Sequence, residues 1–451
     1  MKPMNTSYLY KTCAAALLAL CTASTATGQE RWSLRRCIDY AIEHNINIQQ
    51  TANTAEQSKL EVNTAKWARL PNLNGSAGQN WSWGRSQTAV ADEETGEYNT
   101  MYVNTKTHGT SFGLSAGMPL FTGLQIPNQY ALAKLNLQAA MADLDKAKED
   151  IAINIASLYL QVLFNYELHE VALSQAALSR QQHERISRLA RVGKASEAEV
   201  AEAYARVAQD EMTVTQTDND YRLAVLDLCQ LIELDSPEGF QVEAPQVLNE
   251  TAPLPAPDEI YQIALAEKPS IQAAKYRLQG SLHSIRIAQS AYYPQLSVNG
   301  SIGTNYYSTI NRTFNQQMKD NFSKYVGFSL SVPLFNRLST RNRVRTARLQ
   351  RDNYALQLDE AKKTLYKEIQ QAWYNAAAAV SKYHSSHAAM QASDASFRLT
   401  RQKYEGGTAN AVEYNEAKQN LLKAQSDELQ AKYEYLFRVK ILDFYRGVPI
   451  E

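Results

Sequence analysis

The chain has 451 residues, enough for one large core or for two or three ordinary domains. Lys and Arg together number 46 and Asp and Glu together number 46, so the formal net charge is zero. This balance excludes a general nucleic-acid binder, which needs a basic surface.

The first 28 residues have the pattern of an export signal. Lys2 and Lys11 supply positive charge, Cys13–Cys21 is a short apolar stretch, and small residues precede Gln29 as a cleavage site. The apolar stretch is too short to cross a bilayer as a helix. No small residue precedes either cysteine of the signal, as a lipoprotein would require, so we expect export without lipidation.

The mature chain then reads as a first structural repeat over residues 29–232. Proline ends its first helix, because the residue before a proline is biased away from helical geometry. In chain order we predict a helix (Leu34–Leu70), a β-hairpin (71–121), a long helix (Gln125–Arg191), a turn at Gly193 and a return helix (Ser196–Ile232). At 1.5 Å per residue the long helix would measure roughly 100 Å.

A proline-rich linker over 233–257 leads to a second repeat over 258–451. The segment "AIEHNINIQ" returns as "ALAEKPSIQ", and "FGLSAGMPLF" returns as "VGFSLSVPLF". Matching landmarks in the same order predict an internal two-fold repeat. Its predicted elements are a helix (Asp258–Tyr293), a β-hairpin (294–335), a long helix (Arg337–Glu405), a turn at Gly407 and a return helix (Asn410–Tyr445).

Both predicted hairpins alternate apolar and polar residues. Leu73 and Ala77 alternate with Asn74 and Ser76, and Phe328 and its even-numbered neighbours alternate with serine and glycine. One interpretation is a half-buried sheet of a soluble protein. The other is a set of membrane strands that turn apolar side chains to lipid and small polar ones to a lumen. The export signal favours the second, and aromatic residues near the loop ends fit a girdle at the lipid boundary: Trp81, Trp83, Tyr306 and Tyr325.

Four strands cannot close a barrel, and an open edge in lipid leaves unpaired backbone groups. Other copies of the chain must therefore complete it. Two copies give eight strands, a bore that side chains fill, and three give twelve, which leaves room for a lumen. The predicted fold is mainly α with transmembrane β-strands, in which long helices descend from the barrel, turn at glycine and return part of the way.

The two predicted turns carry candidate functional residues. Gly193 and Gly407 can adopt the left-handed conformation that ends a helix. "SEAE" then pairs Ser196 with Glu199, and "NAVE" pairs Asn410 with Glu413, each as a capping box that restarts a helix.

Cys37 and Cys229 are the cysteines of the predicted mature chain, and we expect them near each other, at the start of the first helix and the end of the first return helix. An exported protein can keep such a pair oxidised. The sequence leaves two alternatives open: a disulfide that joins the two helices, or two small buried apolar residues.

No catalytic set is visible in the sequence. The seven histidines are scattered, and His384 and His387 share a helix face without an acidic or cysteine partner in the same short segment. No phosphate-binding glycine loop is present. We therefore predict no enzyme activity, no metal site and no cofactor. Three function classes remain: an export duct, a periplasmic coiled-coil adaptor or scaffold, which would not need amphipathic hairpins, and an enzyme on a helical scaffold.

The chain resembles the TolC-type outer-membrane channels of tripartite efflux and type I secretion systems. The resemblance rests on "AIEHNINIQ", on the strand boundaries "LPNL…MPLFTG" and "YPQL…VPLFN", and on the paired turns "RLARVGKAS" and "QKYEGGTAN". It covers nearly the whole mature sequence. It implies a homotrimer in the outer membrane of a Gram-negative bacterium, with a twelve-stranded barrel, twelve periplasmic helices, a periplasmic adaptor at the helix tips and an inner-membrane pump.

The resemblance also implies roles for residues at the tips. The adaptor would meet Val192, Gly193, Gly406, Gly407 and Thr408. The periplasmic gate would consist of Glu413, Glu416, Glu199, Glu202 and Tyr404. An arginine that some relatives use in the closed state is replaced here by Ala409. Because Glu199 and Glu413 already serve as helix caps, Glu416 is the better gate candidate. The transported substrate is not legible, since drug, metal and protein exporters share this plan.

Overall fold

The computed structural model describes residues 31–91, 98–244 and 254–450, so the predicted export signal lies outside the described residues. The chain divides into two compact units. We call the first the helical unit (Met1–Gln49, Ala147–Ala264 and Tyr366–Glu451) and the second the sheet unit (Gln50–Lys146 and Leu265–Leu365). Each unit is assembled from both halves of the sequence.

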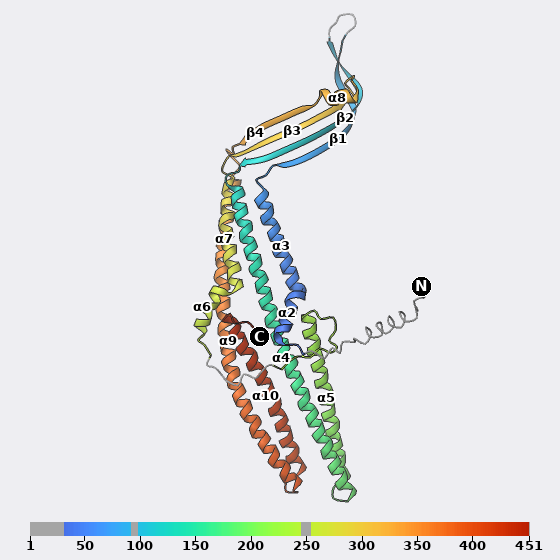
Figure 1. Ribbon diagram of the computed structural model, residues 1–451, viewed down its shortest axis with the longest axis vertical. Coiled ribbons are helices and arrows are strands. Elements are labelled where there is room, and N and C mark those ends of the chain that lie inside the picture. The colour runs from blue at the N-terminus through green and yellow to red at the C-terminus, as the bar shows by residue number, and fades with distance from the viewer. Residues whose placement is uncertain (1–30, 92–97, 245–253, 451) are drawn as a thin grey trace, which may run out of the picture. The chain divides into compact units, whose positions relative to one another are not determined.

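The sheet unit contains a four-stranded antiparallel sheet in the order β1-β2-β3-β4 (Figure 1). The pairing of β2 with β3 joins the two predicted hairpins into one sheet. β1 and β4 are the outer strands, and each leaves one edge unpaired within the described chain. The strands are β1 (Asn72–Ala91), β2 (Tyr98–Phe121), β3 (Gln295–Tyr307) and β4 (Ser323–Ser331).

The strand register divides the sheet into two chemically different faces, as the alternation predicts. Leu73 pairs with Ala116, Val298 with both Met118 and Phe328, and Leu296 with Leu330, so apolar residues share one face. On the outer strands this face is open to solvent, with Leu73 67% and Phe328 73% exposed, and on the inner strands its side chains are half-buried. The opposite face carries small uncharged polar residues: Asn72, Asn74, Ser76, Ser115, Ser297, Asn299, Ser301 and Ser329.

A short helix that the sequence did not predict, α8 (Phe314–Asp320), lies between β3 and β4. Thr313 and Gln316 form a capping box at its start. Gln317 is buried, and its side-chain oxygen accepts a hydrogen bond of 3.0 Å from the backbone N–H of Tyr307. Its amide nitrogen lies within hydrogen-bond distance of the carbonyls of Tyr307, Ile310 and Arg312, so hydrogen bonds fix the connection between these strands.

Helices continue from the strands within the sheet unit. α3 (Ile46–Trp67) precedes β1, and α7 (Pro269–Ser290) precedes β3. The first part of α4 (Gln125–Arg191) follows β2, and the first part of α9 (Ser339–Glu405) follows β4.

The helical unit contains the remaining parts of α4 and α9 and their return helices. α5 (Glu197–Leu231) runs beside α4, and α10 (Ala411–Tyr445) runs beside α9 (Figure 1). The unit also holds α2 (Leu34–His44) and most of α6 (Pro257–Glu267). Fully buried apolar side chains from these helices form its core: Ile155, Val162, Leu228, Ile260, Ile369 and Leu442.

The long helices match the sequence prediction closely. α4 has the predicted bounds, and α9 begins two residues later than predicted because Arg337 and Leu338 adopt left-handed φ angles of 53° and 64°. α4 contains one 18-residue window with a mean hydropathy of 1.2, long and apolar enough by composition to span a membrane. Apolar residues of α4 such as Ile155 and Val162 are buried among the helices of the unit.

The prediction of one continuous first helix in each repeat is wrong. Asn45 interrupts the first with φ −62° and ψ 126°, and Lys268 interrupts the second with φ −62° and ψ 127°. The Asn45 side-chain oxygen accepts from the N–H of Asn47 at 3.0 Å and so caps α3. Lys268 precedes Pro269, which starts α7 and disfavours helical geometry before it.

Candidate functional site

The two helical hairpins of the helical unit end in turns of the same geometry. Gly193 has φ +73° and Gly407 has φ +76°. The N–H of Lys194 donates to the carbonyl of Leu189 and that of Thr408 to Lys403, both at 2.8 Å. Each bond spans five residues, the pattern of a Schellman motif that closes a helix around a left-handed glycine.

The first hairpin restarts with a complete capping box. The N–H of Glu199 donates to Ser196 Oγ at 3.2 Å, and the N–H of Ser196 donates to Glu199 Oε2 at 2.6 Å. The hydrogen bond from the Ser196 backbone, with one from its hydroxyl, lowers the pKa of the Glu199 carboxyl. Glu199 therefore stays ionised at the positive end of α5.

The second hairpin has one of the two hydrogen bonds of a capping box at the start of α10. The N–H of Glu413 donates to Asn410 Oδ1 at 2.9 Å. The Glu413 carboxylate accepts from the Asn410 side-chain amide at 2.9 Å instead of from its backbone. The cap predicted from the sequence is therefore present, but the reciprocal bond goes to a side chain.

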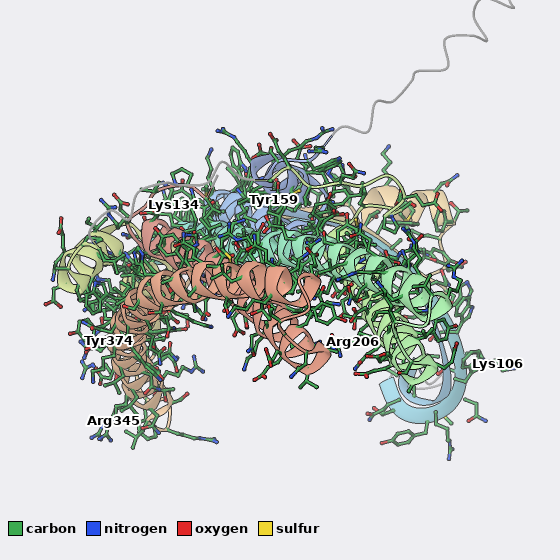
Figure 2. The ribbon with its side chains drawn as sticks, turned by 90° about the horizontal axis from the view of Figure 1, so that it is seen from below. Lys106, Lys134, Tyr159, Arg206, Arg345 and Tyr374 are labelled. Carbon is green, nitrogen blue, oxygen red and sulfur yellow. The ribbon has the colours of Figure 1, made fainter. Side chains whose placement is uncertain are left out.

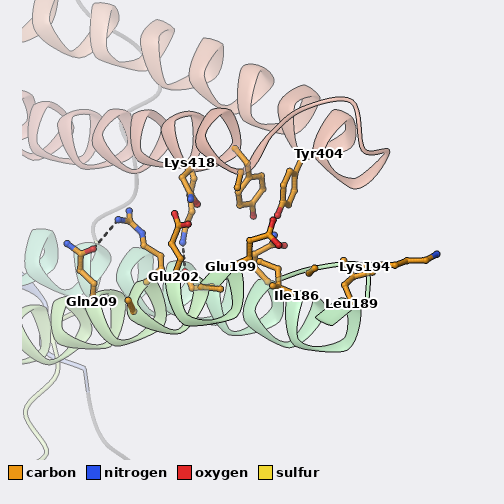
Figure 3. A pocket seen from close by; sticks show the side chains of 17 residues that line it. Ile186, Leu189, Lys194, Glu199, Glu202, Gln209, Tyr404 and Lys418 are labelled. Carbon is orange, nitrogen blue, oxygen red and sulfur yellow. Dashed lines mark hydrogen bonds between the residues drawn. The ribbon is translucent and has the colours of Figure 1, made fainter. Parts of the chain in front are cut away.

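A groove of about 460 Å³ lies between the two hairpins, and we call it the tip groove. Lys194, Glu199 and Glu202 line it from the first hairpin. Tyr404 and Lys418 line it from the second, and Figure 3 shows the Tyr404 side chain pointing toward Glu199 across the groove. Three of the five predicted gate residues thus come together here.

The other two predicted gate residues lie outside the tip groove. Glu413 and Glu416 are exposed on α10 and are not part of the groove wall. Glu416 makes no hydrogen bond or ion pair within the part of the chain that the structure describes. The structure therefore separates the predicted set into a groove group and an outward-facing pair.

Tyr404 is held in an aromatic and cationic environment. Its ring stacks on Tyr414, with centroids 4.8 Å apart, and the Arg185 guanidinium lies 5.3 Å from the Tyr404 ring centroid. Arg185 also donates to the carbonyl of Glu405 at 3.2 Å. These contacts connect α4 to the end of α9 and fix Tyr404 at the mouth of the groove.

A buried charged cluster at the inner end of the tip groove was missed from the sequence. Lys418 Nζ lies 2.9 Å from Asp210 Oδ2, and the two side chains are 2% and 8% exposed. Ser179 accepts a hydrogen bond from Lys418 and donates one to Asp210. Burial lowers the pKa of Lys418, against the hydrogen bond and charge of Asp210. The cluster joins α4, α5 and α10.

A second ionic tie crosses between the hairpins farther from the tips. Lys432 Nζ of α10 lies 2.9 Å from Glu167 Oε1 of α4, and the Tyr433 hydroxyl donates to the same carboxylate at 2.7 Å. Burial, together with the neighbouring Glu167, raises the pKa of Tyr433.

The sequence held one signal for the buried cluster around Lys418. This lysine falls in the helical spacing of the apolar side chains Tyr414, Ala417 and Leu421, which predicts that it is buried with them.

Cys37 and Cys229 are buried free thiols, and no disulfide joins them in the structure. Burial, and then the neighbouring Cys229, raises the pKa of Cys37 to about 12, and burial raises the pKa of Cys229 to about 11. The arrangement is the alternative in which both act as small buried apolar residues.

The predicted docking residues lie at the exposed ends of the hairpins. Val192 is 68% exposed, and a Cβ added at Gly193 or Gly407 would meet no atom within 4 Å. Gly406 follows directly after the end of α9 and keeps a helix-type hydrogen bond, since its N–H donates to the carbonyl of Gln402 at 2.9 Å. No group of three metal-binding side chains occurs among the described residues.

Comparison with known proteins shows which family this architecture belongs to. A family model described as outer membrane efflux protein matches residues 37–232 and 260–447. Outer membrane protein OprJ of Pseudomonas aeruginosa is 24% identical over 400 residues, covering 86% of this chain and 78% of its own length. Alkaline protease secretion protein AprF of the same species is 24% identical over 425 residues, covering 90% of this chain and 83% of its own length.

A solved structure has the same fold. The CmeC outer membrane channel of Campylobacter jejuni superposes with a TM-score of 0.76 at 19% identity. The match covers 92% of this chain and 85% of that one.

Proposed function

The chain belongs to the outer membrane efflux protein family, and we propose that three copies assemble into an exit duct across the outer membrane. The matched segments include both helical hairpins and all four strands. The relatives are named as an outer membrane protein, an alkaline protease secretion protein and an outer membrane channel, and the chain is a conduit of this family.

The sheet carries the proposal of a shared barrel. Its apolar face is open, its other face is small and uncharged, and β1 and β4 each have a free edge. In water an exposed apolar face of this size is unfavourable, and in lipid a free strand edge is unfavourable. Lipid against the apolar face removes the first problem, and pairing β4 of one copy with β1 of the next removes the second; three copies then give twelve strands around a lumen.

We propose that the helical unit lies in the periplasm and that its tips receive a periplasmic adaptor coupled to an inner-membrane pump. The exposed apolar Val192 and the open space around Gly193 and Gly407, with the exposed Gly406 and Thr408 beside them, support this docking site. AprF is named for protease secretion and OprJ for no substrate, so the cargo class stays open.

The two groups of acidic residues suggest different roles in a gate. Glu199, Glu202 and Tyr404 line the groove between the two hairpins of one chain. Glu413 and Glu416 project from α10 away from that groove. We assign the outward pair to the axis of the trimer, where three copies bring like charges together and favour cations.

Fractionation and channel recording test the proposal. The mature protein should pellet with the outer membrane, resist carbonate extraction and form channels in planar bilayers. Recovery as a soluble periplasmic protein would instead support an adaptor or scaffold.

Glu416→Ala should raise single-channel conductance and reduce cation selectivity, because it removes three axial charges. Glu61→Ala, at an exposed acid of α3 in the sheet unit, is the matched control and should leave both unchanged. Conductance and selectivity that do not change in Glu416→Ala would reject the gate role of this residue while leaving the duct intact.

A further inference from the structure

The start of α9 carries a concentration of positive charge that the duct function does not use. Between Leu334 and Arg351 there are six arginines and no acidic residue: Arg337, Arg341, Arg343, Arg345, Arg348 and Arg351. Arg351 pairs with Asp352 at 2.9 Å. Arg341, Arg345 and Arg348 make no ion pair with any described residue. The matching start of α4, from Leu124 to Met141, carries a single charge at Lys134.

The three unpaired arginines line one cavity. They fall at i, i+4 and i+7, so they share a face of α9. The cavity, which we call the arginine cavity, measures about 500 Å³. Gln289, Tyr292 and Tyr293, at and just after the end of α7, form its other wall, and Arg345 is labelled in Figure 2. No acidic side chain of the described residues lines the cavity. Its donors are guanidinium, hydroxyl and amide groups, which suit a phosphate oxyanion.

The position of the arginine cavity along the chain identifies the source of that oxyanion. The apolar face of β4 continues into Leu334 and Phe335, which are 93% and 80% exposed, and the arginines follow directly. Tyr292 and Tyr293 are 53% and 54% exposed just before β3 begins. Apolar residues, then tyrosines and basic residues, mark the boundary between hydrocarbon and headgroups.

We propose that the arginine cavity binds the phosphate of an anionic phospholipid in the periplasmic leaflet, and so fixes the depth of the barrel in the membrane. The proposal rests on the membrane location of the sheet. Arg341, Arg345 and Arg348 contact the phosphodiester, and Tyr292 and Tyr293 lie at the level of the glycerol backbone.

Native mass spectrometry of the detergent-purified full-length trimer tests the site, with dioleoyl phosphatidylglycerol and dioleoyl phosphatidylcholine as probes. The wild type should retain phosphatidylglycerol in clear preference to phosphatidylcholine. The triple variant R341Q/R345Q/R348Q should retain it on the order of tenfold less. R341K/R345K/R348K should fall between them, because lysine keeps the charge but loses the bidentate geometry.

A matched control removes three positive charges elsewhere. R180Q/R222Q/R398Q replaces exposed arginines that already pair with acids in the helical unit, and it should bind phosphatidylglycerol as the wild type does. Equal retention by the control and by R341Q/R345Q/R348Q would overturn the site. So would a wild type that does not distinguish the two lipids, or full displacement of phosphatidylglycerol by millimolar inorganic phosphate, which would indicate a free-anion site. A wild type that is not found in the outer membrane would instead overturn the proposed function.

Discussion

The first helical hairpin, α4 with α5, and the second, α9 with α10, share a backbone plan and differ in side-chain chemistry. Both long helices have 67 residues and both return helices have 35. At the contacts between them, the first hairpin supplies the acids Asp210 and Glu167, and the second supplies Lys418 and Lys432. The two hairpins therefore have the same backbone plan but opposite charges where they meet, so each hairpin is complementary to the other and not to a copy of itself.

Of the two ion pairs between the hairpins, the buried pair of Lys418 and Asp210 should contribute most to the free energy of unfolding. Lys418→Met removes the closest cation from the buried Asp210, which keeps only the Arg206 guanidinium at 3.8 Å, and should cost about 3 kcal/mol of the free energy of unfolding. Urea unfolding followed by circular dichroism measures this. The double variant K418M/D210L should recover most of the loss, because an apolar pair replaces a buried ion pair at little cost.

The half-buried ion pair of Lys432 and Glu167 is the matched comparison for the buried pair. Lys432 and Glu167 are 20% and 29% exposed, so Lys432→Met should cost about 1 kcal/mol or less. An equal loss in K418M and K432M would contradict the assignment of the Lys418 cluster as the main link between the hairpins.

The pH dependence of stability tests the burial of two titratable side chains in the helical unit, Tyr433 and Cys37. The pKa values of Tyr433 and Cys37 are raised above their ordinary 10.0 and 9.0, chiefly by burial. Above pH 9 the folded chain therefore holds protons that the unfolded chain releases, so stability is complete below pH 9 and falls as the pH rises toward 12. Urea midpoints at pH 8, 10 and 11 should decrease in that order.

Tyr433→Phe separates the contribution of the second hairpin to this loss. The variant should be less stable at pH 8, because it lacks the hydrogen bond to Glu167, but its decline between pH 10 and 11 should be shallower. A decline as steep as that of the wild type would show that Tyr433 does not contribute.

The turns should respond equally, because here the two hairpins are alike. Gly193→Ala and Gly407→Ala each force a side chain into left-handed geometry with no steric clash, and each should cost about 1 kcal/mol. Gly406→Ala is the adjacent control and should be neutral or slightly stabilising, because Gly406 has no left-handed φ angle and keeps a helix-type hydrogen bond to Gln402. A clear difference between the two turn variants would show that one tip has contacts that the other lacks.

Local sequence rules predicted the elements and failed at contacts between distant residues. Proline and glycine positions and the apolar–polar alternation located the long helices, the strands and the turn glycines. The breaks at Asn45 and Lys268 were missed because a single polar residue and a proline inside a strong helical pattern were outweighed by their neighbours. Asn45 also donates to the carbonyl of Leu231, 186 residues away, which no local pattern reveals.

The sequence predicted where the candidate gate residues lie but not which of them come together. The resemblance placed five gate residues at the tips, and the structure separates Glu413 and Glu416 from the groove that holds the other three. Lys418 and Asp210 are 208 residues apart in the chain, so each reads as an ordinary helix charge until the hairpins are packed together.

Native mass spectrometry of protein extracted from the outer-membrane fraction tests the central claim most directly. The account predicts a complex of three identical mature chains, since one sheet with a free edge on each side is stable in lipid when sister strands pair with it. A monomer, or protein recovered entirely from the soluble periplasmic fraction, would contradict it.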